Sequence, residues 1–234
     1  MKPSQYRDEA VLGASEYFSN TVAQKNVQVR SELTMYSALK RAIDIIGSLV
    51  GLILLSPLIA FIALLIKIED PKGPVFFYQT RVGKNEKPFR MYKLRSMMTD
   101  AEEKLKELLD KNEIKGAMFK MKDDPRITKV GKFIRKTSID ELPQLLNVLK
   151  GDMSLVGPRP PLLREVAEYT EHDKQRLLVT PGCTGLWQVS GRNHLSFEQM
   201  VELDITYIDK RSILLDIKIL LKTVKAVVAS KDAF

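Results

Sequence analysis

The sequence predicts an α+β protein that is mostly helical, with a re-entrant membrane hairpin helix, a small β-hairpin or sheet, and interfacial amphipathic helices. Three observations predict this fold. Residues 45–66 form an apolar run without a charge, and a Ser-Pro pair interrupts it. Two aromatic-rich segments, 75–80 and 89–94, surround a glycine-containing turn. Beyond them, apolar residues recur with the spacing of amphipathic helices.

The composition is that of a globular, basic protein. Hydrophobic residues make up 44% of the 234 residues, and 37 Lys+Arg against 29 Asp+Glu give a formal charge of +8. An anionic partner is expected: nucleic acid, an acidic membrane surface or a phosphorylated substrate. The single cysteine, Cys183, excludes an intramolecular disulfide, and two histidines are too few for a Cys/His zinc cluster. Any metal should therefore be a hard cation on carboxylates.

Three segments are expected along the chain. Residues 1–35 are polar and weakly periodic, which indicates an N-terminal tail or an accessory helix, and the first ten residues lack the apolar core of a signal peptide. Residues 36–72 contain the membrane helix-break-helix. Residues 73–234 form a cytosolic domain that ends in an interfacial helix.

The apolar run is long enough to matter to a membrane. Its 22 residues, at about 1.5 Å per residue, roughly match a hydrocarbon core of about 30 Å. Pro57 removes a backbone hydrogen bond in the middle of the run, next to Ser56, so a kink is expected there.

Basic residues flank the run on both sides and mark the cytosolic side of a membrane. The favoured topology is a re-entrant hairpin in which residues 45–56 enter and residues 57–66 return. A kinked spanning helix and a buried helix of a soluble core are the alternatives. The flanking residues are Lys40, Arg41, Lys67 and Lys72.

Helices are predicted after the hairpin from the spacing of apolar residues. The last of the internal ones is announced by Ser196-x-x-Gln199, a capping-box pattern. The predicted ranges are 100–114, 140–149, 162–179 and 197–210.

A further helix is expected at residues 213–229. Lys218, Lys222 and Lys225 form a narrow basic stripe on this otherwise apolar segment. Such a helix can lie in the membrane interface with its lysines towards anionic headgroups. A core helix with a solvated lysine face is the alternative.

Two adjacent carboxylates, Asp140 and Glu141, follow a strongly basic segment, 115–136. Either Ser138 and Glu141 form a capping box, or Asp140 is the N-cap and Pro143 lies in the first turn; the sequence does not choose. Both frames place the carboxylates at the positive end of a helix, which favours their ionised forms. Ionised carboxylates suit nucleophilic attack or Mg²⁺ binding, whereas plain helix capping is the structural alternative.

Arginines stand in two loops whose prolines and glycines restrict or free the backbone. Residues 157–161 hold Arg159 between prolines, and residues 181–192 end in Arg192. Because arginine forks bind phosphate oxygens in a bidentate manner, these loops and the basic segment suggest a substrate with more than one phosphate. Arg135, just before the carboxylates, belongs to the same predicted set.

The order of these motifs closely resembles the bacterial sugar transferase family, the monotopic phosphoglycosyl transferases. The resemblance runs from about Tyr36 to the C-terminus. The matching segments are Lys40-Arg41 with Asp44, the run with Ser56-Pro57, and residues 92–97, 124–128, 135–144, 157–160 and 181–192.

The resemblance implies an activity: transfer of a sugar 1-phosphate from a UDP-sugar to undecaprenyl phosphate with release of UMP, on the cytosolic face of the bacterial inner membrane and with Mg²⁺. It implies that Asp140 attacks the β-phosphate and forms a phosphosugar intermediate, and that Glu141 assists. Asp140, as an ionised carboxylate, is also the predicted metal ligand. Lys93, Arg95 and Gln188, within the matching motifs, complete the predicted phosphate-binding set with Arg135, Arg159 and Arg192. Larger relatives carry additional spanning helices, so this chain is expected to be a catalytic-core form.

Other readings compete with this enzyme. The chain could be a non-catalytic, membrane-anchored module that binds acidic lipid through its basic segment. Nucleic-acid binding would explain the charge but not the apolar run, and no series of stacking aromatics is seen, so no nucleic-acid partner is expected. The sugar, the glycan pathway and a homo-oligomeric state are left open.

Overall fold

The computed structural model describes residues 5–101, 103–104, 121, 124–191 and 195–229. The chain separates into two compact units, Met1–Ala42 and Ile43–Phe234. Helix α1 (Gln5–Glu69) begins in the first unit and ends in the second. All contacts discussed below lie within the second unit.

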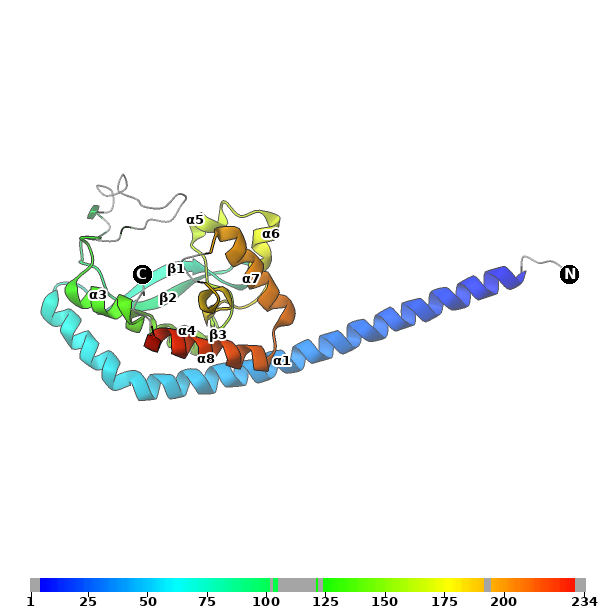
Figure 1. Ribbon diagram of the computed structural model, residues 1–234, viewed down its shortest axis with the longest axis horizontal. Coiled ribbons are helices and arrows are strands. Elements are labelled where there is room, and N and C mark those ends of the chain that lie inside the picture. The colour runs from blue at the N-terminus through cyan, green and yellow to red at the C-terminus, as the bar shows by residue number, and fades with distance from the viewer. Residues whose placement is uncertain (1–4, 102, 105–120, 122–123, 192–194, 230–234) are drawn as a thin grey trace. The chain divides into compact units, whose positions relative to one another are not determined.

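Helix α1 passes through the Ser-Pro pair without ending. Pro57 cannot donate a hydrogen bond to the carbonyl of Ile53, and the Ser56 hydroxyl donates to this carbonyl instead, at 2.8 Å. Figure 1 shows the helix bending within this apolar segment, in cyan. The predicted kink is thus accommodated in one continuous, bent helix.

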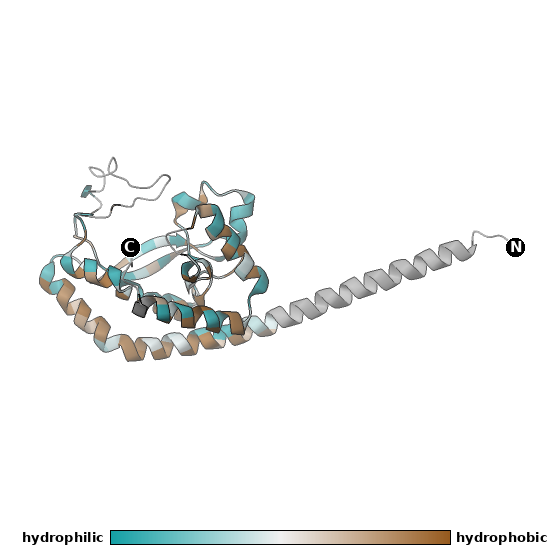
Figure 2. Cartoon of the chain, in the orientation of Figure 1, coloured by the Kyte–Doolittle hydropathy of each residue, from teal (hydrophilic) through white to brown (hydrophobic). Residues whose placement is uncertain are grey.

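The apolar segment of α1 leaves most of its surface uncovered. Between Thr34 and Glu69, only 11% of the most apolar window is buried inside the protein. Figure 2 shows hydrophobic residues following each other along this part of the helix. A helix of a soluble core would be mostly buried, so that alternative does not fit. Between Ile45 and Ile68, the exposed large hydrophobic side chains are Ile45, Ile46, Leu49, Val50, Ile53, Leu54, Phe61, Leu64 and Ile68.

The first half of the apolar segment is attached to the rest of the unit through Asp44. Its buried carboxylate accepts a hydrogen bond from the backbone N–H of Leu155, at 2.9 Å. Two glycines on this half admit neighbouring side chains, since a Cβ on Gly47 would lie 2.8 Å from Leu155 and a Cβ on Gly51 would lie 3.1 Å from Leu145.

The second half packs by its side chains and ends in a polar anchor. Ile62 and Ile66 form a buried cluster with Leu94 and Ile134. At its end, the Glu69 carboxylate accepts from the N–H groups of residues 129 and 130, at 2.7 and 3.0 Å. These are the first N–H groups of helix α3 (Lys129–Lys136), so Glu69 satisfies donors that a helix start leaves without intrahelical partners.

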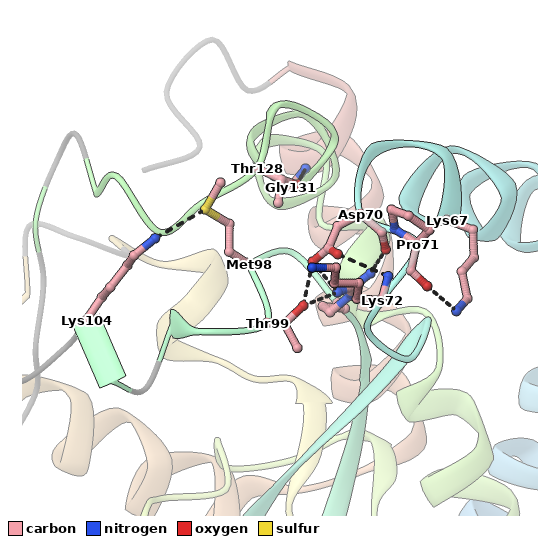
Figure 3. Close-up of polar contacts among 10 residues, drawn as sticks. Lys67, Asp70, Pro71, Lys72, Met98, Thr99, Lys104, Thr128 and Gly131 are labelled. Atoms are coloured by element: carbon pink, nitrogen blue, oxygen red, sulfur yellow. Dashed lines mark hydrogen bonds and ion pairs between the residues drawn. The ribbon is translucent and has the colours of Figure 1, made fainter.

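Asp70 closes the same corner of the protein. Its carboxylate accepts from the Thr99 hydroxyl at 2.7 Å and from the backbone N–H of Lys72 at 3.3 Å (Figure 3). It also forms a 2.6 Å ion pair with Arg95, and these contacts lower the pKa of Asp70. The segment that follows α1 is therefore tied to the segment that follows the hairpin.

The predicted β-hairpin is confirmed. Strands β1 (Phe76–Val82) and β2 (Pro88–Leu94) pair antiparallel, from Phe76↔Leu94 to Val82↔Pro88. The connection is a short 3₁₀ turn, η1 (Lys84–Glu86), in which Asn85 and Glu86 have positive φ.

A second pair of strands was not predicted. Strands β3 (Ser154–Val156) and β4 (Gly182–Thr184) pair in parallel. A Cβ on Gly182 would lie 2.0 Å from the nitrogen of Gly157, so this close approach of two backbones requires glycine.

The helical predictions were partly right. Helix α7 (Phe197–Lys210) begins with the predicted capping box, and α8 (Ile213–Ala229) covers the predicted last helix. The helix predicted at 140–149 is a 3₁₀ turn, η3 (Ile139–Glu141), followed by α4 (Gln144–Lys150). Most of the helix predicted at 100–114 lies outside the described residues.

The single helix predicted at 162–179 is wrong. The segment forms α5 (Leu163–Val166), α6 (Glu171–Lys174) and η4 (Gln175–Leu177). Thr170 explains the interruption, since its side chain caps α6 together with Asp173 and so starts a new helix inside the expected one.

Two small cores hold the strands against the helices. Met91, Val148 and Met153 form one, against which Cys183 packs. Val156, Tyr207 and Ile219 form the other, and join β3 to α7 and α8.

Asn147 of α4 pairs with strand β2 as a neighbouring strand would. Its side chain, which is fully buried, accepts from the Tyr92 N–H at 3.0 Å and donates to the Arg90 carbonyl at 2.7 Å and to Asp152 at 3.2 Å. One amide side chain therefore fixes α4 against the hairpin.

Replacing Asn147 should destabilise the protein strongly. Asn147→Ala leaves two partly buried backbone groups, the Tyr92 N–H and the Arg90 carbonyl, without this partner, which should lower the free energy of unfolding by up to about 1–3 kcal/mol for each group. Asn147→Asp has the same shape but turns a carboxylate towards two acceptors, so it should be at least as damaging. The thermal unfolding midpoint in detergent is the measurement. His172→Ala, which removes an exposed pair with Glu202, is the control and should change the midpoint little. A midpoint for Asn147→Asp equal to that of the wild type would contradict this account.

Candidate active site

Asp140 and Glu141 lie in the turn η3, between α3 and α4. Ser138 precedes them in the left-handed conformation, with φ 55°, and its side chain caps nothing. Helix α4 begins only after Pro143. Both capping frames considered from the sequence are therefore wrong, and neither carboxylate is occupied in closing a helix end.

A lysine of the hairpin joins the two carboxylates. Lys93 Nζ lies 2.7 Å from Glu141 Oε1 and 3.9 Å from Asp140 Oδ2. Asp140 is 7% exposed, whereas the Glu141 side chain is 37% exposed. The structure thus brings together Lys93, Asp140 and Glu141 from the predicted set.

The two carboxylates differ in their electrostatics. Burial raises the pKa of Asp140 to about 6, although the charges of Lys93 and Arg135 oppose this. Burial also acts to raise the pKa of Glu141, but Lys93, Arg159 and Arg81 outweigh it and hold this pKa below its ordinary value. At neutral pH, Asp140 is therefore a poorly solvated anion, whereas the charge of Glu141 beside it is compensated by Lys93 and the two arginines.

Four basic side chains act electrostatically on this carboxylate pair. Lys93 and Arg135 lower the pKa of Asp140, and Lys93, Arg159 and Arg81 lower that of Glu141. Four cations against two carboxylates leave the site with an excess of positive charge. Such a site attracts a ligand that carries more than one negative charge.

Arg159 projects from a buried turn. The prolines on both sides of it are buried, while Arg159 itself is half-buried. The turn is fixed from two directions, because Gly182 donates to the carbonyl of residue 158 at 2.8 Å and Val82 donates to that of Pro161 at 2.9 Å. The loop therefore presents a guanidinium on a rigid support.

The other predicted residues lie elsewhere or outside the described chain. The Arg95 guanidinium is bound to Asp70 and Thr99. Gln188 lies half-buried in the turn η5 (Trp187–Val189). Arg192 is outside the residues that the structure describes.

Arg81 was missed from the sequence. It is buried at the end of β1, and its charge acts on Glu141. The available signal was that Arg81 is the single charged residue of segment 75–83, where the side chains are otherwise aromatic, aliphatic or small and polar.

This arrangement can support attack by a carboxylate on an electrophile that bears several negative charges. Asp140 is ionised at neutral pH and poorly solvated, both of which favour a nucleophile. The surrounding cations can stabilise charge that develops on the oxygens of a phosphoryl group during transfer.

The opposite pKa directions predict opposite stability effects for two isosteric substitutions. The raised pKa of Asp140 means that its ionisation opposes folding above about pH 6, so Asp140→Asn should stabilise the protein at pH 8, by at most about 3 kcal/mol. This gain should shrink as the pH falls through 6 towards 4. The lowered pKa of Glu141 means that its charge supports folding above its ordinary pKa, so Glu141→Gln should be destabilising at pH 8 and less so in acid.

Thermal midpoints of both variants at pH 8 and pH 5, with EDTA present, check these signs. Shifts of both variants in the same direction at pH 8 would refute the electrostatic difference between the two carboxylates.

The sequence is similar to those of known proteins over most of the chain. A sequence model of the family described as "Bacterial sugar transferase" matches residues 35–230. The chain is 54% identical over 195 residues to "Galactosyl transferase CpsE" of Streptococcus agalactiae, which covers 83% of this chain and 43% of that protein. It is 45% identical over 221 residues to "Undecaprenyl-phosphate galactose phosphotransferase" of Salmonella typhimurium, covering 93% of this chain and 46% of the relative.

The chain thus spans less than half the length of these two curated relatives. A shorter relative, "Exopolysaccharide production protein ExoY" of Rhizobium meliloti, is 41% identical over 199 residues, which are 83% of this chain and 88% of that protein. The match of the family model across most of the chain, together with this near full-length similarity, shows that the chain belongs to the bacterial sugar transferase family.

Proposed function

We propose that this protein transfers a sugar 1-phosphate from a UDP-sugar to undecaprenyl phosphate, as the first membrane step of polysaccharide assembly. The observation that carries the proposal is the buried carboxylate of Asp140, which lies beside the Lys93–Glu141 ion pair; the charge of Arg135 acts on Asp140, and those of Arg159 and Arg81 act on Glu141. The names of the relatives supply the acceptor and the type of transfer.

In the first step, an Asp140 carboxylate oxygen attacks the β-phosphorus of the UDP-sugar. The bond between this phosphorus and the oxygen that bridges the two phosphates breaks, and UMP leaves with the electron pair. Asp140 then carries the sugar phosphate as an acyl phosphate. Lys93 keeps Glu141 beside the reacting group, and Arg159 binds phosphate oxygens.

In the second step, a phosphate oxygen of undecaprenyl phosphate attacks the same phosphorus. The bond to Asp140 breaks, which restores the carboxylate and yields a lipid diphosphate sugar. Dividing the transfer into two displacements predicts ping-pong kinetics.

Mg²⁺ fits this site through Asp140 and the substrate. No group of three or more potential ligands, taken among His, Cys, Asp and Glu, occurs in the described part of the chain. Mg²⁺ is nevertheless commonly held by one or two carboxylates plus phosphate oxygens and water, and Asp140 provides such a carboxylate. Bound there, the ion would neutralise charge on the diphosphate.

The donor sugar is proposed from the relatives' names. The relatives from Streptococcus agalactiae and Salmonella typhimurium are named for galactosyl transfer and galactose phosphate transfer, so UDP-galactose is the first donor to assay. A panel that includes UDP-glucose and N-acetylated amino sugars, with UMP release as the readout, tests this choice.

The family and the exposed apolar helix indicate a membrane-associated protein. We further propose that α1 enters the cytosolic leaflet of the inner membrane and returns. In support, Asp44 at one end of the apolar segment and Glu69 at the other are both bonded to the same compact unit. A straight spanning helix would carry one of these ends across the bilayer.

Helix α8 supports the same placement. Four exposed apolar side chains recur along it at helical spacing, and the three lysines of the basic stripe are exposed as well. A helix with this surface can lie in the interface beside anionic headgroups. The apolar residues are Leu214, Ile217, Leu221 and Val224.

Cysteine labelling tests the re-entrant topology. Single cysteines near Tyr36 and near Lys72, on opposite sides of the apolar segment, should both react with a membrane-impermeant maleimide only in inverted vesicles. Pro57→Ala restores the backbone donor and should favour a spanning form, which would give labelling from both sides. Labelling of the two wild-type positions from opposite faces would show that α1 spans the membrane.

Trapping of the covalent intermediate tests the activity. Purified protein incubated with UDP-galactose labelled in the sugar, without lipid acceptor, should carry label on the peptide that contains Asp140, and hydroxylamine should release it. Asp140→Asn should abolish labelling because an amide cannot form the acyl phosphate. Glu141→Gln should slow labelling without abolishing it.

Asp209→Asn, which changes an exposed aspartate of α7, is the matched control and should label like the wild type. Transfer to lipid with sequential kinetics and no trappable adduct would instead favour direct attack by the lipid phosphate. Lipid binding without transfer from any UDP-sugar would favour the membrane-anchored binding module.

A further inference from the structure

Arg81 is a buried arginine whose hydrogen-bond partners are all neutral. It is 6% exposed, its Nε and Nη2 donate to Gln79 Oε1 at 3.1 and 2.7 Å, and its Nη1 donates to the carbonyl of Pro160 at 3.1 Å. Among the described residues it forms no salt bridge. The other buried arginines of the described chain each pair with an aspartate: Arg95 with Asp70, Arg126 with Asp124, and Arg176 with Asp204.

A buried cation that forms no salt bridge is costly to the fold, and the nearby carboxylates of Glu165 and Glu141 compensate the charge of Arg81 only in part. Burial is the main cause that lowers the pKa of Arg81, to about 10, and the charge of Arg159 adds to it. The guanidinium is nevertheless protonated at neutral pH. A residue that served packing alone would be better neutral, so the retained charge points to an anion that is bound when the protein works.

The contacts of Arg81 lead directly to the phosphate-binding loop. Its side chain holds the Pro160 carbonyl, while the N–H of the next residue, Val82, holds the carbonyl of Pro161. Arg159 immediately precedes these two prolines. Strand β1 therefore donates hydrogen bonds to two successive carbonyls on one side of Arg159, and the Arg81 side chain donates one of the two.

We propose that Arg81 is a positioning residue for the diphosphate site: it fixes the loop that carries Arg159 and, held by neutral Gln79, keeps its own charge available to the bound diphosphate. This inference rests on the proposed function in one respect, that Arg159 binds phosphate. The neutral partner is part of the proposal, since a carboxylate at position 79 would hold Arg81 equally well but cancel its charge.

The first test separates the two roles of Arg81, fixing the loop and providing positive charge to the diphosphate. It measures UDP binding to the purified full chain in detergent. Gln79→Glu should keep or raise the thermal midpoint while weakening UDP binding about tenfold. Thr80→Glu, the matched control, adds the same charge at the adjacent exposed position and should change UDP affinity less than about twofold. Equal weakening in both variants, or unchanged affinity in Gln79→Glu, would overturn the charge part of the proposal.

The second test asks whether Arg81 acts through Arg159. Arg81→Lys keeps the charge but loses the planar fork, and should weaken UDP binding about tenfold. In an Arg159→Gln background the same substitution should add no more than about a threefold loss, because the loop then has no guanidinium to position. Effects that multiply, or wild-type affinity in Arg81→Lys, would overturn the positioning role.

Arg90→Lys, in which the arginine of β2 that stacks on Tyr78 is changed, should bind UDP like the wild type. Should Arg81→Lys fail to fold, Gln79→Glu alone still decides the charge part.

The outcomes also separate this inference from the proposed function. Coupling between Arg81 and Arg159 in UDP binding, with no labelled Asp140 in the wild type, would reject the transferase mechanism and keep the positioning residue. A labelled Asp140 without such coupling would support the transferase mechanism and reject the positioning role of Arg81. A wild-type protein that does not bind UDP at all would overturn both.

Discussion

The attachment of one apolar helix at both of its ends is the constraint on which the remaining structure depends. Most side chains of this segment face outward, so its position relies on a small number of contacts with the rest of the unit. Asp44 bonds one end to the backbone of β3, and Glu69 bonds the other to the first turn of α3. Both bonds join a carboxylate to main-chain N–H groups, whose direction is set by the fold and not by a flexible side chain.

Each attachment point precedes a segment of the site. Leu155, which donates to Asp44, stands two residues before the loop that carries Arg159. Helix α3, whose start is bonded to Glu69, leads through Ser138 to Asp140. Asp140 and the loop that carries Arg159 are thus attached to the two ends of the same helix, and Asn147 fixes the hairpin that carries Lys93 against α4.

Local sequence patterns predicted what local interactions decide. The alternating aromatic segments formed the hairpin, and Ser196 with Gln199 started α7, because strand pairing across a short turn and helix capping act within a few residues. The carboxylate pair could also be singled out by sequence. The sequence did not predict that these carboxylates cap no helix, because this depends on the left-handed conformation of Ser138 and on the residue at which α4 begins. Likewise β3 and β4 are too short to show a pattern. Arg81 stands out in the sequence as the single charge of its segment, but its hydrogen bond to a loop 79 residues away cannot be predicted from that segment.

The unpaired Cys183 sits in strand β4, packed against Met91, Val148 and Met153. Burial raises the pKa of this thiol far above the neutral range, so the reactive thiolate is scarcely formed while the strand stays in place. Because β4 pairs with the strand that receives Asp44, separation of this pair would expose the sulfur. Cys183 is therefore a natural probe of local unfolding. The rate at which a small disulfide reagent modifies this thiol in the native protein measures how often the β3–β4 pair, which connects α1 to the site, opens.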